Sequence, residues 1–258
     1  MIRVGLAVLT LMLSIGAAIA QSEVERTWQQ AQIWLPGTLN AVTPADIPAD
    51  TQAKAVVLYA HGCDGPSRIT TVSARFLAAA GYLVAAPDSF ARREKPVSCD
   101  PTIPRGGLHR EVLGWREAEL RHAMTRLRAI TATRGLPIAL MGHSEGGITV
   151  ATMEAPDAAL RVIEGWTCHA GWPEYRGLNA PVDQPVLSLV GAQDPWFRAP
   201  VLRGYCRAFM PDGAPMRSVV YRPPGYLAEK HWLTADAEVQ ATVLDFLSDN
   251  LPPEKDAP

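Results

Sequence analysis

The sequence has little lysine and no cluster of basic residues. Its 258 residues include four lysines and twenty arginines, which are spread along the chain, and the formal net charge is −2. Proteins that bind nucleic acid or acidic membrane surfaces gather cations on one face, so neither partner is expected. Repeats and low-complexity stretches are absent, and 48% of the residues are hydrophobic. This composition excludes disordered and fibrous classes and predicts a globular core.

Cysteine is also scarce, and its spacing is unlike that of a metal site. The four cysteines form no C-x-x-C pair and no cluster with histidine; they are Cys63, Cys99, Cys168 and Cys206. A zinc site needs several such ligands at short spacings. The sequence therefore predicts neither a metal nor another cofactor.

Only the N-terminus carries a long hydrophobic run. Residues 1–20 combine Arg3, an apolar stretch and the small residues Ala18 and Ala20, which is the build of a secretory signal peptide. An uncleaved membrane anchor is the alternative, although the run is short for a span. Cleavage would leave a mature chain that starts at Gln21, has no membrane span and is exported to the periplasm or secreted. In an oxidising compartment four cysteines favour two disulfides, for which three pairings are open.

The rest of the chain alternates short apolar runs with helical periodicity. We expect strands at residues 53–60, 82–86, 138–141, 162–167, 184–190 and 217–221. Helices are expected at residues 68–80, 111–131, 146–153, 200–210 and 235–251. Alternation of this kind predicts one α/β domain over residues 21–258, with a mostly parallel sheet, helices on both faces and ligands at the carboxyl ends of the strands. An eight-fold barrel also fits the length, but the site residues favour an open sheet.

A possible nucleophile follows the strand expected at 138–141. Gly142, Ser144 and Gly146 form a G-x-S-x-G pattern between this strand and a helix. Glycines allow the tight turn that pushes the serine hydroxyl out of the sheet. Ser144 is thus the candidate nucleophile; the alternative is a glycine-rich helix start capped by a serine.

A serine hydroxyl needs a base, and the base needs an acid that orients it. Asp194 follows the strand at 184–190, at its carboxyl end, whereas Asp183 lies at the opposite end of that strand. His231 follows the next strand and precedes the last helix, so the order serine, acid, histidine is complete. A turn aspartate and a surface histidine are the alternative interpretations.

Acyl transfer also needs two backbone N–H donors for the oxyanion. Glu145, directly after the serine, supplies one candidate amide. Cys63 supplies the other, in the loop His61-Gly62-Cys63-Asp64-Gly65 after the first central strand. His61 is interpreted as a buried residue that orients this loop, and Asp64 as a turn residue.

These motifs resemble the α/β-hydrolase family, with HGCDG, GHSEGG, the acid loop GAQD and His231 in the expected order. The stretch GYLVAAPDSFARR at 81–93, followed by Cys99, is similar to the dienelactone hydrolase group. One departure matters: classical dienelactone hydrolases carry a cysteine where this chain has Ser144. The departure argues against lactone cleavage and leaves serine ester hydrolysis as the activity that the resemblance implies. Its strand order also implies disulfides Cys63–Cys99 and Cys168–Cys206.

The leading hypothesis is an exported serine hydrolase that cleaves a small-molecule carboxylic ester or lactone through an acyl-enzyme on Ser144. A serine peptidase or acyltransferase with the same three residues is the first alternative. A non-catalytic binding protein on the same fold is the second.

Aromatic and basic residues near the strand ends are candidates for the substrate pocket. The tryptophans are Trp166, Trp172, Trp196 and Trp232, which either wall an aromatic cleft or pack in the core. Arg92 and Arg93 either pair with a substrate carboxylate or lie on a solvated loop. The stretch between Asp88 and Arg110 is long enough for a small lid.

Overall fold

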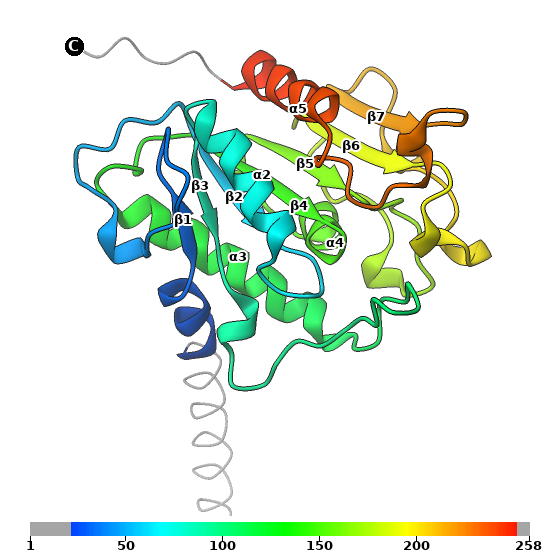
Figure 1. The fold of residues 1–258 in the computed structure, drawn as a ribbon, viewed down its shortest axis with the longest axis horizontal. Helices are drawn as coiled ribbons and strands as arrows, with labels where there is room; N and C mark the ends of the chain where they lie inside the picture. The colour runs from blue at the N-terminus through cyan, green and yellow to red at the C-terminus, as the bar shows by residue number, and fades with distance from the viewer. Residues whose placement is uncertain (1–21, 252–258) are drawn as a thin grey trace, which may run out of the picture.

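The computed structural model describes residues 22–251, which are built around a seven-stranded sheet (Figure 1). The predicted signal peptide at 1–20 lies outside these residues. The strand order is β1-β3-β2-β4-β5-β6-β7; β1 pairs with β3 in antiparallel fashion, and all other neighbours are parallel. The strands are β1 (Gln32–Trp34), β2 (Val56–Ala60), β3 (Leu83–Ala86), β4 (Ile138–His143), β5 (Leu160–Glu164), β6 (Val186–Gly191) and β7 (Met216–Tyr221).

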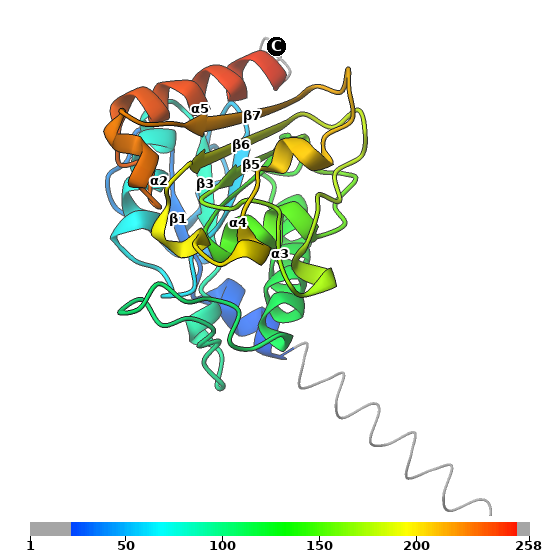
Figure 2. The ribbon, with the colours of Figure 1, turned by 90° about the vertical axis from the view of Figure 1, so that its right-hand side faces the viewer.

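Helices cover both faces of the sheet (Figures 1 and 2). Their bounds are α2 (Arg68–Ala79), α3 (Glu111–Ala129), α4 (Glu145–Thr152) and α5 (Ala237–Asn250). Side chains alternate between the faces of a strand, so Leu58 of β2 packs in the core under α3 and α4, whereas Tyr59 packs under α2 and α5. Within residues 22–251 no helix is both long and apolar enough to cross a bilayer. The expected α/β architecture is confirmed, as an open sheet.

The parallel strands bring the candidate site residues to one edge of the sheet. Cys63 follows β2, Ser144 follows β4, Asp194 follows β6 and His231 follows β7. Because parallel strands end at the same edge, residues up to 168 positions apart in sequence meet there.

The prediction of a helix at residues 200–210 is wrong. Two short 3-10 turns, Pro200–Leu202 and Cys206–Phe209, occupy this segment. Gly204 separates them with φ +140, and the ring of His169 fills the space where a side chain at 204 would lie. Helical spacing alone did not reveal these local constraints.

The N-terminal part of the described chain contains elements that the sequence did not indicate. Residues 22–29 are helical, and Gln32–Trp34 form the antiparallel edge strand β1. Ile33 and Trp34 are buried. A three-residue strand is too short to show an alternating pattern, so only its burial against β3 identifies it.

Arg161 on β5 joins the sheet to the end of α4. Its guanidinium is fully buried and donates to the carbonyl oxygens of Val150 (2.7 Å) and Met153 (2.8 Å) and to Oε1 of Gln184 (2.6 Å). Burial lowers the pKa of Arg161 to about 10. The side chain thus satisfies acceptors that would otherwise lie unpaired in the core.

Arg161→Leu is expected to lower the free energy of unfolding by about 2–3 kcal/mol, because buried acceptors lose their donor. Urea denaturation of the purified chain measures this change. Arg128→Leu is the matched control, since the Arg128 side chain is 43% exposed and pairs with Asp157 at the surface; it should cost less than about 1 kcal/mol. Equal losses in the two variants would contradict the role given to Arg161.

Candidate active site

Ser144 sits in a sharp turn between β4 and α4 with a strained backbone, φ 57 and ψ −118. Two glycines make the turn possible. A Cβ on Gly142 would lie 2.1 Å from the carbonyl oxygen of Gly146, and one on Gly146 would lie 1.9 Å from the carbonyl oxygen of Ala60. Backbone segments therefore approach more closely than any side chain allows, and the hydroxyl of Ser144 is carried to the edge of the sheet.

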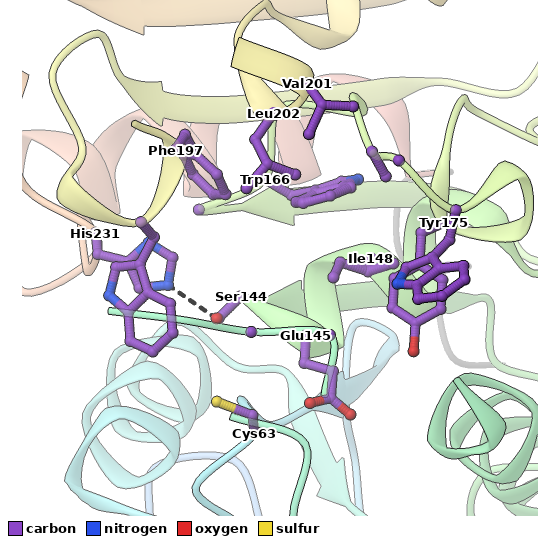
Figure 3. A pocket seen from close by; sticks show the side chains of 17 residues that line it. Cys63, Ser144, Glu145, Ile148, Trp166, Tyr175, Phe197, Val201, Leu202 and His231 are labelled. Carbon is purple, nitrogen blue, oxygen red and sulfur yellow. Dashed lines mark hydrogen bonds between the residues drawn. The ribbon is translucent and has the colours of Figure 1, made fainter. Parts of the chain in front are cut away.

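The structure brings Ser144, His231 and Asp194 into one hydrogen-bonded chain. Nε2 of His231 lies 2.8 Å from Oγ of Ser144 (Figure 3), and Nδ1 of His231 lies 2.6 Å from Oδ2 of Asp194. Asp194 is 3% exposed, and its other oxygen accepts from the amide of Trp196 (2.9 Å). An Nδ1–H donated to the carboxylate leaves Nε2 free to accept the serine proton, which is the arrangement that activates a hydroxyl.

Aromatic rings fix the orientation of His231. The ring of Trp196 stacks on it at a centroid distance of 5.0 Å and an interplanar angle of 23°. Phe197 and His143 approach at 5.7 and 5.0 Å. Burial, and then the nearby His231, lower the pKa of His143 well below its usual value. His143 is therefore a neutral packing partner.

Glu164, at the end of β5, connects the serine to the histidine loop. Its backbone oxygen accepts from the amide of Ser144 (2.8 Å). Its carboxylate is fully buried and accepts from the amides of Leu233 (2.7 Å) and Thr234 (2.6 Å) and from the Thr234 hydroxyl (3.0 Å). Burial raises the pKa of Glu164. The sequence analysis missed this residue; its signal was a carboxylate at the end of an apolar strand.

A buried polar network supports the loop that contains Cys63. The amide of Ser89 donates to Nε2 of His61 (3.2 Å), and Nδ1 of His61 lies 2.7 Å from the carbonyl oxygen of Gly62. Nε2 is then the acceptor and Nδ1 carries the proton, as expected because burial and the charge of Arg116 lower the pKa of His61 well below its usual value. Arg116 also donates to the His61 carbonyl at 2.5 Å. His61 thus orients the loop.

Glu145 belongs to the same network through its side chain. Its carboxyl group accepts from the hydroxyl of Ser98 and lies 3.8 Å from Nη1 of Arg116. Burial raises the pKa of Glu145. Because Ser98 precedes Cys99, this contact holds the segment to which Cys63 is covalently joined.

Two residues expected in the pocket lie elsewhere. Arg92 is 9% exposed, pairs with Glu119 at 2.8 Å and places its guanidinium 4.8 Å from the ring centre of Trp115. Its charge is compensated inside the protein, so the assignment of Arg92 to a substrate carboxylate is wrong. Trp232, next to His231, is not among the residues that line the cavity described below.

A cavity of about 230 Å³ opens beside Ser144 (Figure 3). Ser144, His231, Cys63 and Glu145 border it, so both candidate oxyanion residues lie next to the serine. The expected tryptophans Trp166, Trp172 and Trp196 line its walls. The remaining lining residues are Gly106, Gly107, Ile148, Gly165, Ala170, Gly171, Tyr175, Phe197, Val201 and Leu202.

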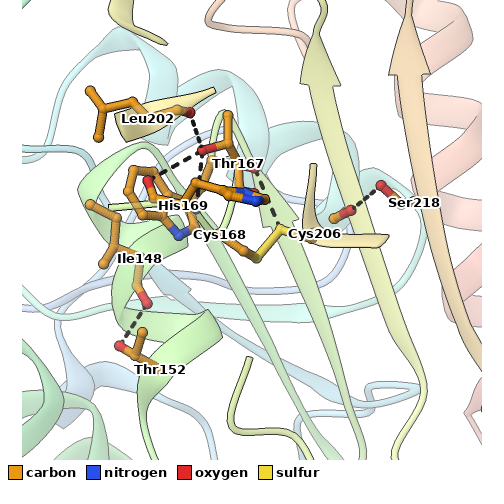
Figure 4. Close-up of a disulfide and its surroundings, with 10 residues drawn as sticks. Ile148, Thr152, Thr167, Cys168, His169, Leu202, Cys206 and Ser218 are labelled. Carbon is orange, nitrogen blue, oxygen red and sulfur yellow. Dashed lines mark hydrogen bonds between the residues drawn. A yellow bond between two sulfur atoms is a disulfide. The ribbon is translucent and has the colours of Figure 1, made fainter. Parts of the chain in front are cut away.

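The disulfides Cys63–Cys99 and Cys168–Cys206 are confirmed, and they leave no free cysteine among the described residues. The first joins the loop after β2 to the segment that contains Gly106 and Gly107. The second lies beside the cavity wall, where the hydroxyl of Thr167 donates to the Leu202 carbonyl at 2.8 Å (Figure 4). Both crosslinks are therefore at the edge of the sheet where Ser144, Asp194 and His231 meet.

The strand order, the sharp turn at Ser144 and the chain order of Ser144, Asp194 and His231 together define the α/β-hydrolase fold. Comparison with solved structures supports this fold. A carboxyl esterase from Bacillus coagulans superimposes with a TM-score of 0.58 at 13% identity, covering 85% of this chain and 93% of that one. A dienelactone hydrolase from Anabaena variabilis superimposes with a TM-score of 0.55 at 20% identity, covering 86% of this chain and 92% of that one. An α/β serine hydrolase without lid from Xanthomonas campestris gives 0.55 at 14% identity, with 87% and 90% covered.

The resemblance to dienelactone hydrolase-like proteins is thereby confirmed at the level of the fold. No family model and no curated protein sequence matches the chain.

Glu164→Ala is expected to slow the labelling of Ser144 by a fluorophosphonate about 100-fold, because the loop that carries His231 loses its anchor and small displacements cost that much. Glu164→Gln keeps an acceptor oxygen and should slow labelling less than about tenfold. Rates from gel fluorescence, with folding checked by thermal melting, measure both variants. Wild-type labelling of a folded Glu164→Ala protein would show that Glu164 does not position the histidine.

Proposed function

We propose that the chain is a serine hydrolase that cleaves carboxylic esters or lactones through an acyl-enzyme on Ser144. The observation that carries the proposal is the continuous hydrogen bonding from Asp194 through His231 to Ser144. The esterases and dienelactone hydrolase among the structural neighbours support the same chemistry.

In the first half of the reaction, Nε2 of His231 takes the proton from Oγ of Ser144 as the oxygen attacks the ester carbonyl carbon. The amides of Cys63 and Glu145 donate to the resulting oxyanion. When the tetrahedral intermediate collapses, the carbon–oxygen bond to the alcohol breaks and His231 returns the proton to the departing alkoxide. Asp194 stabilises the imidazolium and keeps its orientation.

In the second half, His231 removes a proton from a water molecule that attacks the acyl-enzyme. When this second tetrahedral intermediate collapses, the bond between the acyl carbon and Oγ of Ser144 breaks, His231 returns the proton to Oγ, and the carboxylic acid leaves. The buried amide contacts of Glu164 keep His231 in reach of both protons. The serine is regenerated without any external reactant other than water.

Labelling with a fluorophosphonate tests the activation of Ser144 without knowledge of the substrate. The mature chain should be labelled, and Ser144→Ala and His231→Ala should reduce labelling by about 1,000-fold or more, since the serine and its base act as a unit. Ser248→Ala and His122→Ala change the same residue types away from the cavity and should label like the wild type. A folded wild-type chain that stays unlabelled would favour a non-catalytic binding protein.

Competing acceptors separate hydrolysis from acyl transfer. An added alcohol or amine should leave the free acid as the main product of the ester reaction. If most of the acyl group moves to the acceptor instead, the chain is an acyltransferase and the hydrolase proposal fails.

We also propose that the chain is exported, on the basis of the leader-like residues 1–20 and the two disulfides. Expression with the full leader in a bacterial host should yield a periplasmic or secreted protein whose N-terminus is Gln21. Mass spectrometry of the intact protein measures this end and the absence of free thiols. A protein that keeps residue 1 and is found in the membrane fraction would instead support the uncleaved anchor.

A further inference from the structure

The cavity beside Ser144 has aromatic walls that begin at the reacting residues. Trp196 and Phe197 pack against His231, and the ring of Phe197 meets that of Trp166 edge to face at 5.7 Å. Trp172 and Tyr175 continue the wall from the segment after β5. An apolar group bound here would therefore lie against ring faces and edges, close to the scissile bond. An aromatic ring gains more from such contacts than an aliphatic group does, because rings interact favourably face to edge and in offset stacks.

The size of the cavity limits what it can hold. An apolar cavity of about 150 Å³ accommodates benzene, and this one measures about 230 Å³. The difference leaves room for a linker of a few atoms. One aromatic ring joined by a short linker fits the volume.

The charges around the cavity are compensated within the protein. Among its described lining residues there is no lysine or arginine, and Glu145 is the one acidic residue. The carboxyl group of Glu145 is bonded to Ser98 and lies 3.8 Å from Arg116. Beside the cavity, Arg110 lies 4.1 Å from the ring centre of the lining residue Trp172 but donates twice to Glu174. An anionic ligand would therefore lose its hydration here without gaining a free counter-ion.

We propose that this cavity binds a single uncharged aromatic ring of the ester substrate and discriminates against rings that carry a carboxylate. The proposal rests on the proposed ester hydrolysis and adds the chemical class of the substrate. The ring can reach the cavity from the acyl side or from the alcohol side of the ester. Both sources share one chemistry, and matched esters distinguish them.

The test compares kcat/KM values of the mature chain by pH-stat titration. Methyl hydrocinnamate against methyl propanoate probes a ring on the acyl side, and phenethyl acetate against ethyl acetate probes a ring on the alcohol side. In one of the two pairs the ring should raise kcat/KM by about 100-fold, since a single methylene in a hydrophobic pocket already gives about 10- to 200-fold. If neither ring improves its partner ester, the proposal is overturned.

Charged analogues test the second half of the proposal. A para-carboxylate on the ring of the preferred ester should lower kcat/KM by about 100-fold or more, because no partner replaces its hydration. Equal rates for the carboxylate and the parent ester would overturn the inference.

A pair of valine substitutions tests whether this selectivity arises in the cavity. Val201 lines it and is 54% exposed, whereas Val182 is 61% exposed and lies outside its lining. Val201→Arg supplies a cation and should shift the carboxylate-to-neutral ratio of kcat/KM by about tenfold or more toward the carboxylate, as expected for a new ion pair in a partly buried site. Val182→Arg should leave the ratio unchanged; equal shifts in both variants would contradict binding in this cavity.

Fluorophosphonate labelling separates failure of this inference from failure of the proposed function. A chain that labels at Ser144 and hydrolyses methyl propanoate, but shows no preference for a ring, keeps its proposed function and loses the substrate class. A folded chain that neither labels nor hydrolyses any of these esters overturns both.

Discussion

The left-handed backbone of Ser144 is the constraint on which the rest of the site depends. Ser144 has φ 57, and this backbone conformation costs a residue with a side chain about 1–3 kcal/mol. The surrounding structure must therefore hold Ser144 in it. It does so through the close contact of Gly142 with Gly146 and through the hydrogen bond from the Ser144 amide to Glu164. As a result α4 begins directly behind the hydroxyl, and its first amide, that of Glu145, belongs to the same turn.

Glu164 links the strained turn at Ser144 to the loop that carries His231. Its main chain is bonded to the serine, and its carboxylate is bonded to the two residues that follow Trp232. Glu164, on the strand next to the nucleophile, therefore helps to set the separation of Oγ and Nε2, together with Asp194 and the aromatic rings that pack on His231. A buried carboxylate with several donors is costly to assemble, but once satisfied it is rigid.

Local sequence signals were sufficient for the serine turn, because the spacing of its glycines follows from steric limits at that point in the chain. Asp194 and His231 could be assigned from their order and from the strands they follow, and the disulfide partners from the strand order implied by the resemblance. Arg92 was misassigned because the partner that neutralises it, Glu119, lies on a distant helix. The short strand β1 and the turns at 200–210 depend on tertiary packing, which no window of sequence contains.

The disulfide between Cys168 and Cys206 encloses much of the pocket wall. Ala170, Trp172, Trp196, Phe197 and Val201 all lie between its two cysteines, which are 38 positions apart, and β6 runs through the middle of the segment. These wall residues thus belong to one disulfide-closed loop of the chain, and that loop includes a strand of the sheet. In the chain-entropy account, closing such a ring removes roughly 4 kcal/mol of freedom from the unfolded chain. The disulfide consequently keeps the residues that shape the cavity within one closed loop of the chain, in the unfolded state as well as in the folded one.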